Sequence, residues 1–145
     1  MTVFLDTNVV VASVSELHEH HERSFPILQR VQNKHDEGYV SAHSLLELYA
    51  VLTKLPGSMR HSPEQALLSI EENVVKYFTT VSLQGEDYPA LVRRAGLGGL
   101  QGGTIFDALL LMAAEKVELD RIYTFNRKHF ELFASDKQRR LLREP

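Results

Sequence analysis

Residues 2–8 of the chain read TVFLDTN, a short apolar run that ends at a single carboxylate, Asp6. The run TVFL has the β-favouring composition of a short buried strand. Asp6, Thr7 and Asn8 follow at once, and an apolar run, VVVASV (residues 9–14), then resumes. An unpaired carboxylate is costly to bury. Asp6 therefore predicts either a compensating partner or a bound cation at the end of the first strand.

Strands and helices alternate along the rest of the chain. We predict strands at residues 2–5, 38–42, 77–83 and 121–125. We predict helices at residues 18–37, 44–55, 62–75, 85–97 and 102–117, and a short helical turn at 127–134. Ser62 and Pro63 have the types of an N-cap and a first helical residue, Pro26 is expected near a helix start, and residues 136–145 read as a loosely held charged tail. The alternation predicts an α/β fold with a mainly parallel sheet.

Composition limits the class of protein. The 145 residues, 43% hydrophobic and 24% charged, predict one globular domain over residues 1–145. The absence of cysteine excludes thiolate chemistry and favours a cytoplasmic location. Neither a leader peptide nor an apolar run of about 20 residues is recognisable, so no membrane association is expected. A net charge of −3 means that any nucleic-acid binding would depend on a local basic patch or on metal ions.

Two more lone acids lie in apolar runs. Glu47 lies in SLLELYAVL and Asp107 lies in TIFDALLLMAA. With Asp6 they make three such carboxylates in one small domain, and the set is most simply explained if all three converge on a hard cation such as Mg²⁺ or Mn²⁺. Sites in open parallel sheets form beyond the carboxyl ends of the strands. Asp6 and Asn126 each follow a predicted strand. If these two strands are neighbours, both residues lie at the carboxyl edge of the sheet.

Each acid also has a purely structural interpretation. Thr104 and Asp107 have the spacing of a capping box, and a helix N-terminus favours negative charge. Glu47 has His43 at i−4, which permits an outward-facing side chain. For one acid alone the structural interpretation is the stronger, whereas the set of three favours a metal site.

Four segments, in order, resemble the PIN domain family, and most closely the toxin subunits of VapBC-type toxin–antitoxin pairs. The segments are FLDTNVVVAS, SAHSLLELYAVL, GGTIFDALLLMAAEKV and IYTFNRKHF. The resemblance implies a three-layer α/β/α sandwich and a ribonuclease that depends on Mg²⁺ or Mn²⁺. It also implies RNA as substrate, a cognate antitoxin as partner and, as a further option, a homodimer.

The resemblance also assigns roles by position. Asp6, Glu47 and Asp107 match the catalytic, metal-binding carboxylates, and the matching supporting polar residues are Thr7, Asn8 and Thr104. The fourth acidic position of the family is Asn126 here, and its amide oxygen can contact a metal but brings no charge. Asp120 and Glu115 are poorly placed to replace it, so the second metal position is in doubt.

The other features of the sequence indicate a function less directly than the three acids do. The basic residues that could hold RNA phosphates at the rim are Arg93, Arg94, Arg127 and Lys128, and a solvated surface explains them equally well. The run HEHHE (residues 18–22) invites a zinc interpretation, but we expect exposed surface. The glycines of residues 96–103 lack the context of a phosphate-binding loop.

Two rival functions stay open. One is a phosphoaspartyl phosphatase with Asp6 as nucleophile, for which Asn8 stands where a second Asp is usual. The other is a PIN-like protein that binds RNA or a partner without cleaving, which Asn126 would favour.

Overall fold

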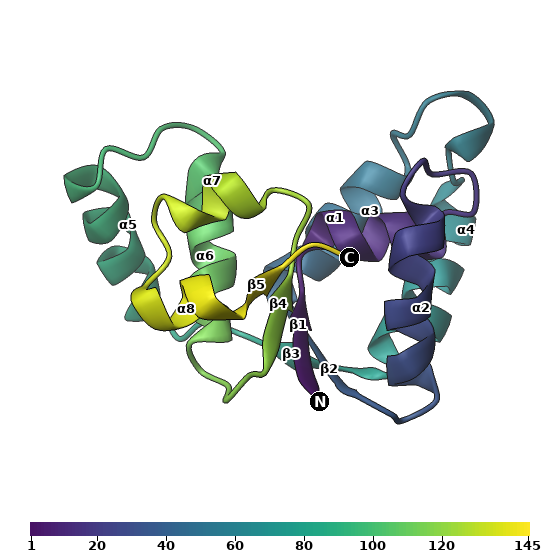
Figure 1. Ribbon diagram of the computed structural model, residues 1–145. Coiled ribbons are helices and arrows are strands. Elements are labelled where there is room, and N and C mark those ends of the chain that lie inside the picture. Colours follow the sequence, from purple (N-terminus) through teal and green to yellow (C-terminus); the bar gives the residue numbers. More distant parts are fainter.

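The computed structural model describes residues 1–145 and places a five-stranded sheet between two layers of helices (Figure 1). The strands are β1 (Thr2–Leu5), β2 (Glu37–Ser41), β3 (Phe78–Val81), β4 (Arg121–Tyr123) and β5 (Leu142–Arg143). Their order is β3-β2-β1-β4-β5, and every neighbouring pair is parallel. The predicted α/β/α sandwich with a parallel sheet is confirmed.

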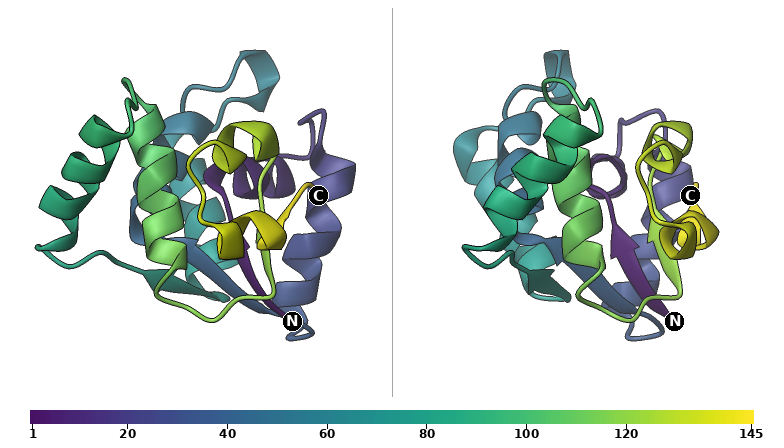
Figure 2. Two further views of the ribbon diagram at one scale, coloured as in Figure 1. Left: turned by 60° about the vertical axis from the view of Figure 1, so that its left-hand side comes forward. Right: turned by 90° about the vertical axis from the view of Figure 1, so that its left-hand side faces the viewer.

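Helices connect the strands and cover both faces of the sheet. They are α1 (Thr7–Val14), α2 (His21–Gln32), α3 (Ala42–Leu52), α4 (Pro63–Ile70), α5 (Asp87–Leu97), α6 (Thr104–Ala114), α7 (Arg127–Glu131) and α8 (Asp136–Leu141). Two single turns, the 3₁₀ turn η1 (Gly57–Met59) and the π-helical turn η2 (Glu71–Val75), flank α4. The turned views show α5 packed alongside α6, away from α2 (Figure 2). No helix is both long enough and apolar enough to span a bilayer.

The alternation of side chains in β1 divides the interior into two cores. Val3 and Leu5 belong to a core shared with α1, α2, α3 and α4, whereas Phe4 belongs to a core shared with α6, α7 and α8. All three side chains are fully buried, as expected for a central strand covered on both faces. β1 is therefore the element around which both helical layers are built.

Close packing also explains one glycine. A Cβ on Gly38 would lie 2.6 Å from ring atoms of Phe78 and from a methyl group of Val31. β2 thus needs glycine where β3 and α2 approach it most closely.

The helix boundaries show which of the predicted helix starts are correct. Ser62 and Gln65 form the two hydrogen bonds of a capping box, and Pro63 is the first residue of α4, as predicted. Pro26 lies inside α2, which begins five residues earlier at His21, so the prediction of Pro26 near a helix start is wrong. No element was predicted for residues 7–14, which form α1 directly after β1.

The prediction of a loosely held C-terminal tail is wrong. Ser135 caps α8 with a capping box, and the buried Gln138 donates from Nε2 to the main-chain oxygen of Leu111 at 2.7 Å. β5 then pairs with β4, and Leu142 is 0% exposed. The charged residues of this segment face solvent, while Gln138 and Leu142 attach it to the second core.

We expect Leu142→Ala to destabilise the fold by about 2–5 kcal/mol, because it removes a fully buried side chain and leaves a cavity. Urea unfolding followed by circular dichroism measures this. Leu132→Ala is the matched control, since Leu132 is 77% exposed and its loss should cost less than about 0.5 kcal/mol. Equal effects of the two substitutions would contradict the placement of β5 in the core.

Candidate active site

The three acids singled out from the sequence line one pocket of about 410 Å³ at the carboxyl edge of the sheet. Asp6 follows β1, Glu47 comes from the middle of α3, and Asp107 comes from the first turns of α6. Asn126, which follows β4, lines the same pocket. Four separate elements therefore converge here, and they do so because β1, β2 and β4 run parallel and end at the same edge.

Asp6 is the most buried of the three acids, at 6% exposed. Its main-chain N–H donates to Tyr123 O at 2.9 Å, which continues the β1–β4 ladder. Its Oδ2 accepts a 2.7 Å hydrogen bond from the Thr124 hydroxyl, which itself accepts from the Asn126 N–H at 3.0 Å. The Asp6 pKa is raised to about 7, chiefly by burial; the hydrogen bond from Thr124 opposes the rise, and the charges of Asp107 and Glu47 add to it.

Glu47 is half-buried on α3. Its Oε1 lies 3.5 Å from His43 Nε2 one turn earlier, an ion pair when the imidazole is protonated. Burial raises the Glu47 pKa, His43 opposes the rise, and the charge of Asp107 adds to it. The outward-facing alternative for Glu47 is wrong, because the side chain lines the same pocket as Asp6.

Asp107 faces a second histidine. Its Oδ2 lies 3.2 Å from His129 Nδ1 of α7. Burial raises its pKa, and His129 opposes that rise. The capping-box alternative is wrong, because Gly103 is the N-cap of α6 and Thr104 is already helical. Asp107 is thus a pocket residue and not a helix cap.

Polar groups around Asp6 complete the floor of the pocket. Asn8 Oδ1 accepts from the Phe125 N–H at 3.5 Å, a long contact that links α1 to the segment after β4. Thr7 lines the pocket, and its buried hydroxyl lies beside Glu47, whose pKa it lowers. The predicted supporting residues Thr7 and Asn8 are therefore both at the site.

The carboxylates share a pocket but do not form a closed metal cluster. No three acidic, histidine or cysteine side chains lie close enough together to enclose an ion. Glu47 and Asp107 are instead paired with His43 and His129. The donor set suits Mg²⁺ or Mn²⁺ by its chemistry, and each histidine contacts only one oxygen of its carboxylate.

The remaining predicted residues lie outside the pocket lining. Thr104 donates its hydroxyl to Gln101 O at 2.5 Å, within the turn that precedes α6. The four basic residues predicted to hold substrate are placed in pairs: Arg93 and Arg94 on α5, Arg127 and Lys128 on α7 directly after Asn126. Arg94 pairs with Glu115 at 3.5 Å and Arg127 with Glu131 at 2.8 Å. Their role in binding substrate stays a prediction.

Sequence reasoning overlooked one residue that supports the pocket from beneath and two that line it. Thr124, which holds Asp6, could have been found as the first polar residue after a strand that neighbours β1. His18 and His20 line the pocket beside Phe125, although the HEHHE run was expected to be exposed surface. The polar character of the run concealed them, because the aromatic ring that His20 stacks on, Phe125, is distant in the chain. Asp120 lies at the opposite edge, as expected, where its Oδ2 accepts from the Thr2 N–H at 2.8 Å.

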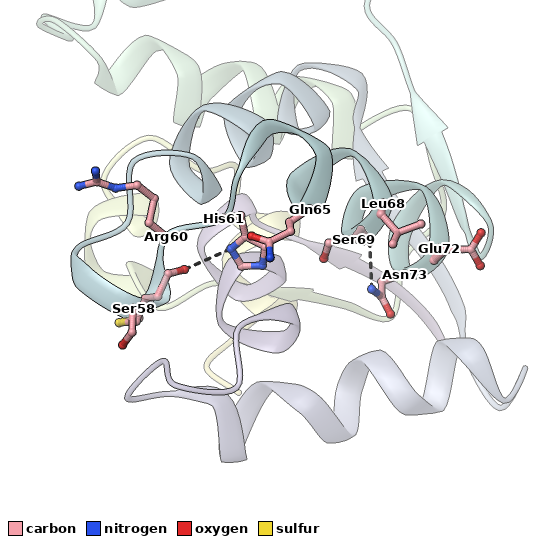
Figure 3. Close-up of a pocket in the computed structure, with 9 residues that line it drawn as sticks. Ser58, Arg60, His61, Gln65, Leu68, Ser69, Glu72 and Asn73 are labelled. Atoms are coloured by element: carbon pink, nitrogen blue, oxygen red, sulfur yellow. Dashed lines mark hydrogen bonds between the residues drawn. The ribbon is translucent and has the colours of Figure 1, made fainter.

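A larger cavity of about 570 Å³ lies along α4 and η2, and Figure 3 shows its lining. Its polar groups are used within the chain: His61 Nδ1 lies 3.2 Å from Met59 O, and Asn73 Nδ2 donates to Ser69 O at 3.0 Å. Its one acid, Glu72, pairs with Lys76 at 3.2 Å. The acidic pocket at the sheet edge is therefore the better candidate for chemistry.

Comparison with known proteins agrees with this architecture. The family model of the PIN domain matches residues 3–134. Ribonuclease VapC27 of Mycobacterium tuberculosis is 31% identical over 80 residues, which is 55% of this chain and 56% of that protein, so the match spans about half of this curated relative. A crystal structure of VapBC2 from Rickettsia felis, bound to a DNA fragment from their promoter, contains a chain that matches the fold. Its TM-score is 0.64 at 19% identity, over 99% of this chain and 98% of that one. The family match covers all four pocket-forming segments and most of the chain, and the chain belongs to the PIN domain family.

Proposed function

We propose that this protein is a metal-dependent endoribonuclease and the toxin component of a toxin–antitoxin system. The observation that carries the proposal is the convergence of Asp6, Glu47 and Asp107, from three separate elements, on one pocket. Membership of the PIN domain family and the partial match to ribonuclease VapC27 support it. The substrate is RNA, and the partner is an antitoxin that would cover the pocket.

The three carboxylates have the chemistry to hold Mg²⁺ or Mn²⁺, with Asn126 as a neutral fourth contact. Burial raises the pKa of all three acids, and like charges add to the rise for Asp6 and Glu47, so a bound cation would favour their ionised forms. A divalent cation bound there would lower the pKa of an attacking water and stabilise the charge that develops on the phosphate. The cation also allows an acidic pocket to approach a polyanion.

The chain's own groups position this chemistry. Thr124 donates to one oxygen of Asp6 and leaves the other available to the pocket. Thr124 is itself oriented by the Asn126 N–H, so the first and fourth motifs are coupled through one hydroxyl. His43 and His129 can carry protons next to Glu47 and Asp107.

Neither rival function gains comparable support. For phosphoaspartyl chemistry, a second carboxylate would be expected two residues after Asp6, and the neutral Asn8 stands there. If the purified chain does not cleave RNA, a non-cleaving PIN protein is the remaining function. Asn126, the one departure from the family pattern, would then account for the loss of cleavage.

Cleavage of RNA by the purified chain tests the proposal. Defined single-stranded RNAs should be cut in Mn²⁺ or Mg²⁺ and left intact in EDTA. Asp6→Asn should reduce the rate by more than about 100-fold, since even outer contacts of metal ligands cost 10–100-fold when removed. Asp120→Asn, the same change at the opposite edge of the sheet, should retain activity. Cutting in EDTA, or equal rates for the two variants, would reject the proposal.

The raised pKa of Asp6 predicts that the stability of the metal-free protein depends on pH. Native Asp6 holds its proton up to a pH of about 7, whereas the unfolded chain releases it near its ordinary pKa of 3.8. Between these values the unfolded state binds fewer protons, so the free energy of unfolding falls as pH rises, on the order of 4 kcal/mol in total from Asp6.

Urea unfolding in EDTA at several pH values between 4 and 8 measures this fall. Asp6→Asn should flatten the curve and make the protein more stable than wild type above pH 7. The two proteins should converge near pH 4, where the wild-type carboxyl is neutral. Parallel curves across the whole range would show that Asp6 is not buried among like charges.

Asn126→Asp should restore the fourth charge and lower the Mn²⁺ concentration required for half-maximal cleavage. A neutral amide near two cations cannot offset their mutual repulsion, whereas a carboxylate can. Asn33→Asp, at the exposed end of α2, adds the same net charge far from the pocket and should leave the Mn²⁺ titration unchanged. If the Asn126→Asp titration matches wild type at every concentration, Asn126 does not contact the metals.

A further inference from the structure

The pocket has a second end that the acids do not explain. Beside the carboxylates it is lined by apolar side chains of α1, α3 and the segment after α3, and by three aromatic rings. The residues of this end are Val11, Val51, Leu55, His18, His20 and Phe125. A site for a bare phosphate or a metal ion has no use for such a surface, whereas a flat aromatic group does.

The loop that carries the histidines is held in place. The His18 N–H donates to Ser15 O at 2.9 Å, and the His21 N–H donates to His18 O at 3.0 Å. The His21 ring is fixed by a 2.9 Å contact between Nδ1 and Ala12 O of α1. The His20 N–H donates to His18 Nδ1 at 3.1 Å. Because His18 Nδ1 accepts this bond, the proton of the neutral ring lies on Nε2, which leaves a donor free.

Two of the aromatic rings are stacked, and the third is tilted against them. His20 lies on Phe125 with ring centroids 4.6 Å apart and an interplanar angle of 26°. His18 follows at 5.7 Å from His20, tilted by 47°. The Arg23 guanidinium lies 5.4 Å from the centroid of Phe125. Bases of single-stranded nucleic acids are bound in this way, on aromatic and guanidinium planes.

We propose that the His18–His20–Phe125 end of the pocket is a subsite for one base of single-stranded RNA, next to the phosphate held at the acidic end. The proposal rests on the proposed ribonuclease function and adds a recognition element to it. Phe125 and Asn126 are consecutive residues, so base and phosphate would be bound by neighbouring positions of one segment. The cavity of about 410 Å³ is within the size range of small-molecule sites.

The stack supplies affinity for any base, and the free Nε2–H of His18 favours bases with an acceptor on the exposed edge. The earlier zinc interpretation of the HEHHE run is less suitable, because His18 and His20 have no third ligand within reach of a shared ion. An RNA base also explains Val51 and Leu55, which zinc would not.

Calorimetric titration of the intact chain in Mn²⁺ tests the subsite without requiring turnover. The probes are the four ribonucleoside 5′-monophosphates and ribose 5-phosphate, which keeps sugar and phosphate but lacks the base. At least one nucleotide should bind roughly 5- to 150-fold more tightly than ribose 5-phosphate, the range expected for stacking of one base.

Three variants separate stacking from other roles of the loop. His20→Ala should remove most of the preference for nucleotide over ribose 5-phosphate, and His20→Phe should restore it, because phenylalanine retains an aromatic face. His35→Ala, at an exposed histidine between α2 and β2, should behave as wild type. Mn²⁺ affinity without nucleotide should be equal in all four proteins.

The outcomes distinguish the two proposals. If ribose 5-phosphate binds as tightly as every nucleotide, or if His20→Ala keeps the preference, the base subsite is wrong and the ribonuclease proposal stands. If His20→Phe fails to restore binding, or if the His20 variants lose Mn²⁺ affinity, the ring acts by shaping the pocket, which also overturns the subsite. If neither nucleotides nor ribose 5-phosphate bind the Mn²⁺-loaded chain, the proposed function fails and the subsite fails with it.

Discussion

The site depends on the parallel pairing of β1 with β4. That pairing aligns Leu5 with Tyr123 and places Asp6 beside Thr124, two residues that are 118 positions apart in the chain. A shift of one residue in register would turn Asp6 away from the pocket and would exchange the two faces of β1 between the two cores. Burial of Val3, Phe4 and Leu5 on opposite faces therefore fixes the position of the first acid.

A pocket built this way concentrates negative charge at a cost to stability. Asp6 is nearly inaccessible, and Glu47 and Asp107 are close enough for their charges to raise its pKa. Elsewhere the fold pairs its buried acid, since Asp36 at the amino end of β2 accepts from Arg30 at 2.6 Å and from the N-terminal ammonium at 2.9 Å. Natural proteins commonly hold functional groups in such unfavourable surroundings.

Much of this architecture could be predicted from local pattern. Alternating strands and helices indicated the parallel sheet, and lone acids in apolar runs indicated the pocket. The failures have a common physical cause, which is that tertiary contacts outweighed local composition. Residues 136–145 read as a charged tail because only Gln138 and Leu142 attach them, through contacts with α6 and β4 that are invisible in sequence. The HEHHE run read as solvated surface because its partner, Phe125, is distant in the chain.

The histidines at the pocket bear on how an acidic protein could approach RNA. Glu47 faces His43 and Asp107 faces His129, while Asp6 shares its oxygen with a hydroxyl. Each acid thus has a partner that moderates its charge when no cation is bound. Each partner contacts only one oxygen of its carboxylate, which leaves the second oxygen of Asp6, Glu47 and Asp107 for a divalent cation. The two imidazoles and the hydroxyl would therefore limit repulsion among the acids without using up the donor set, and the same three carboxylates could hold a cation between the protein and a polyanion.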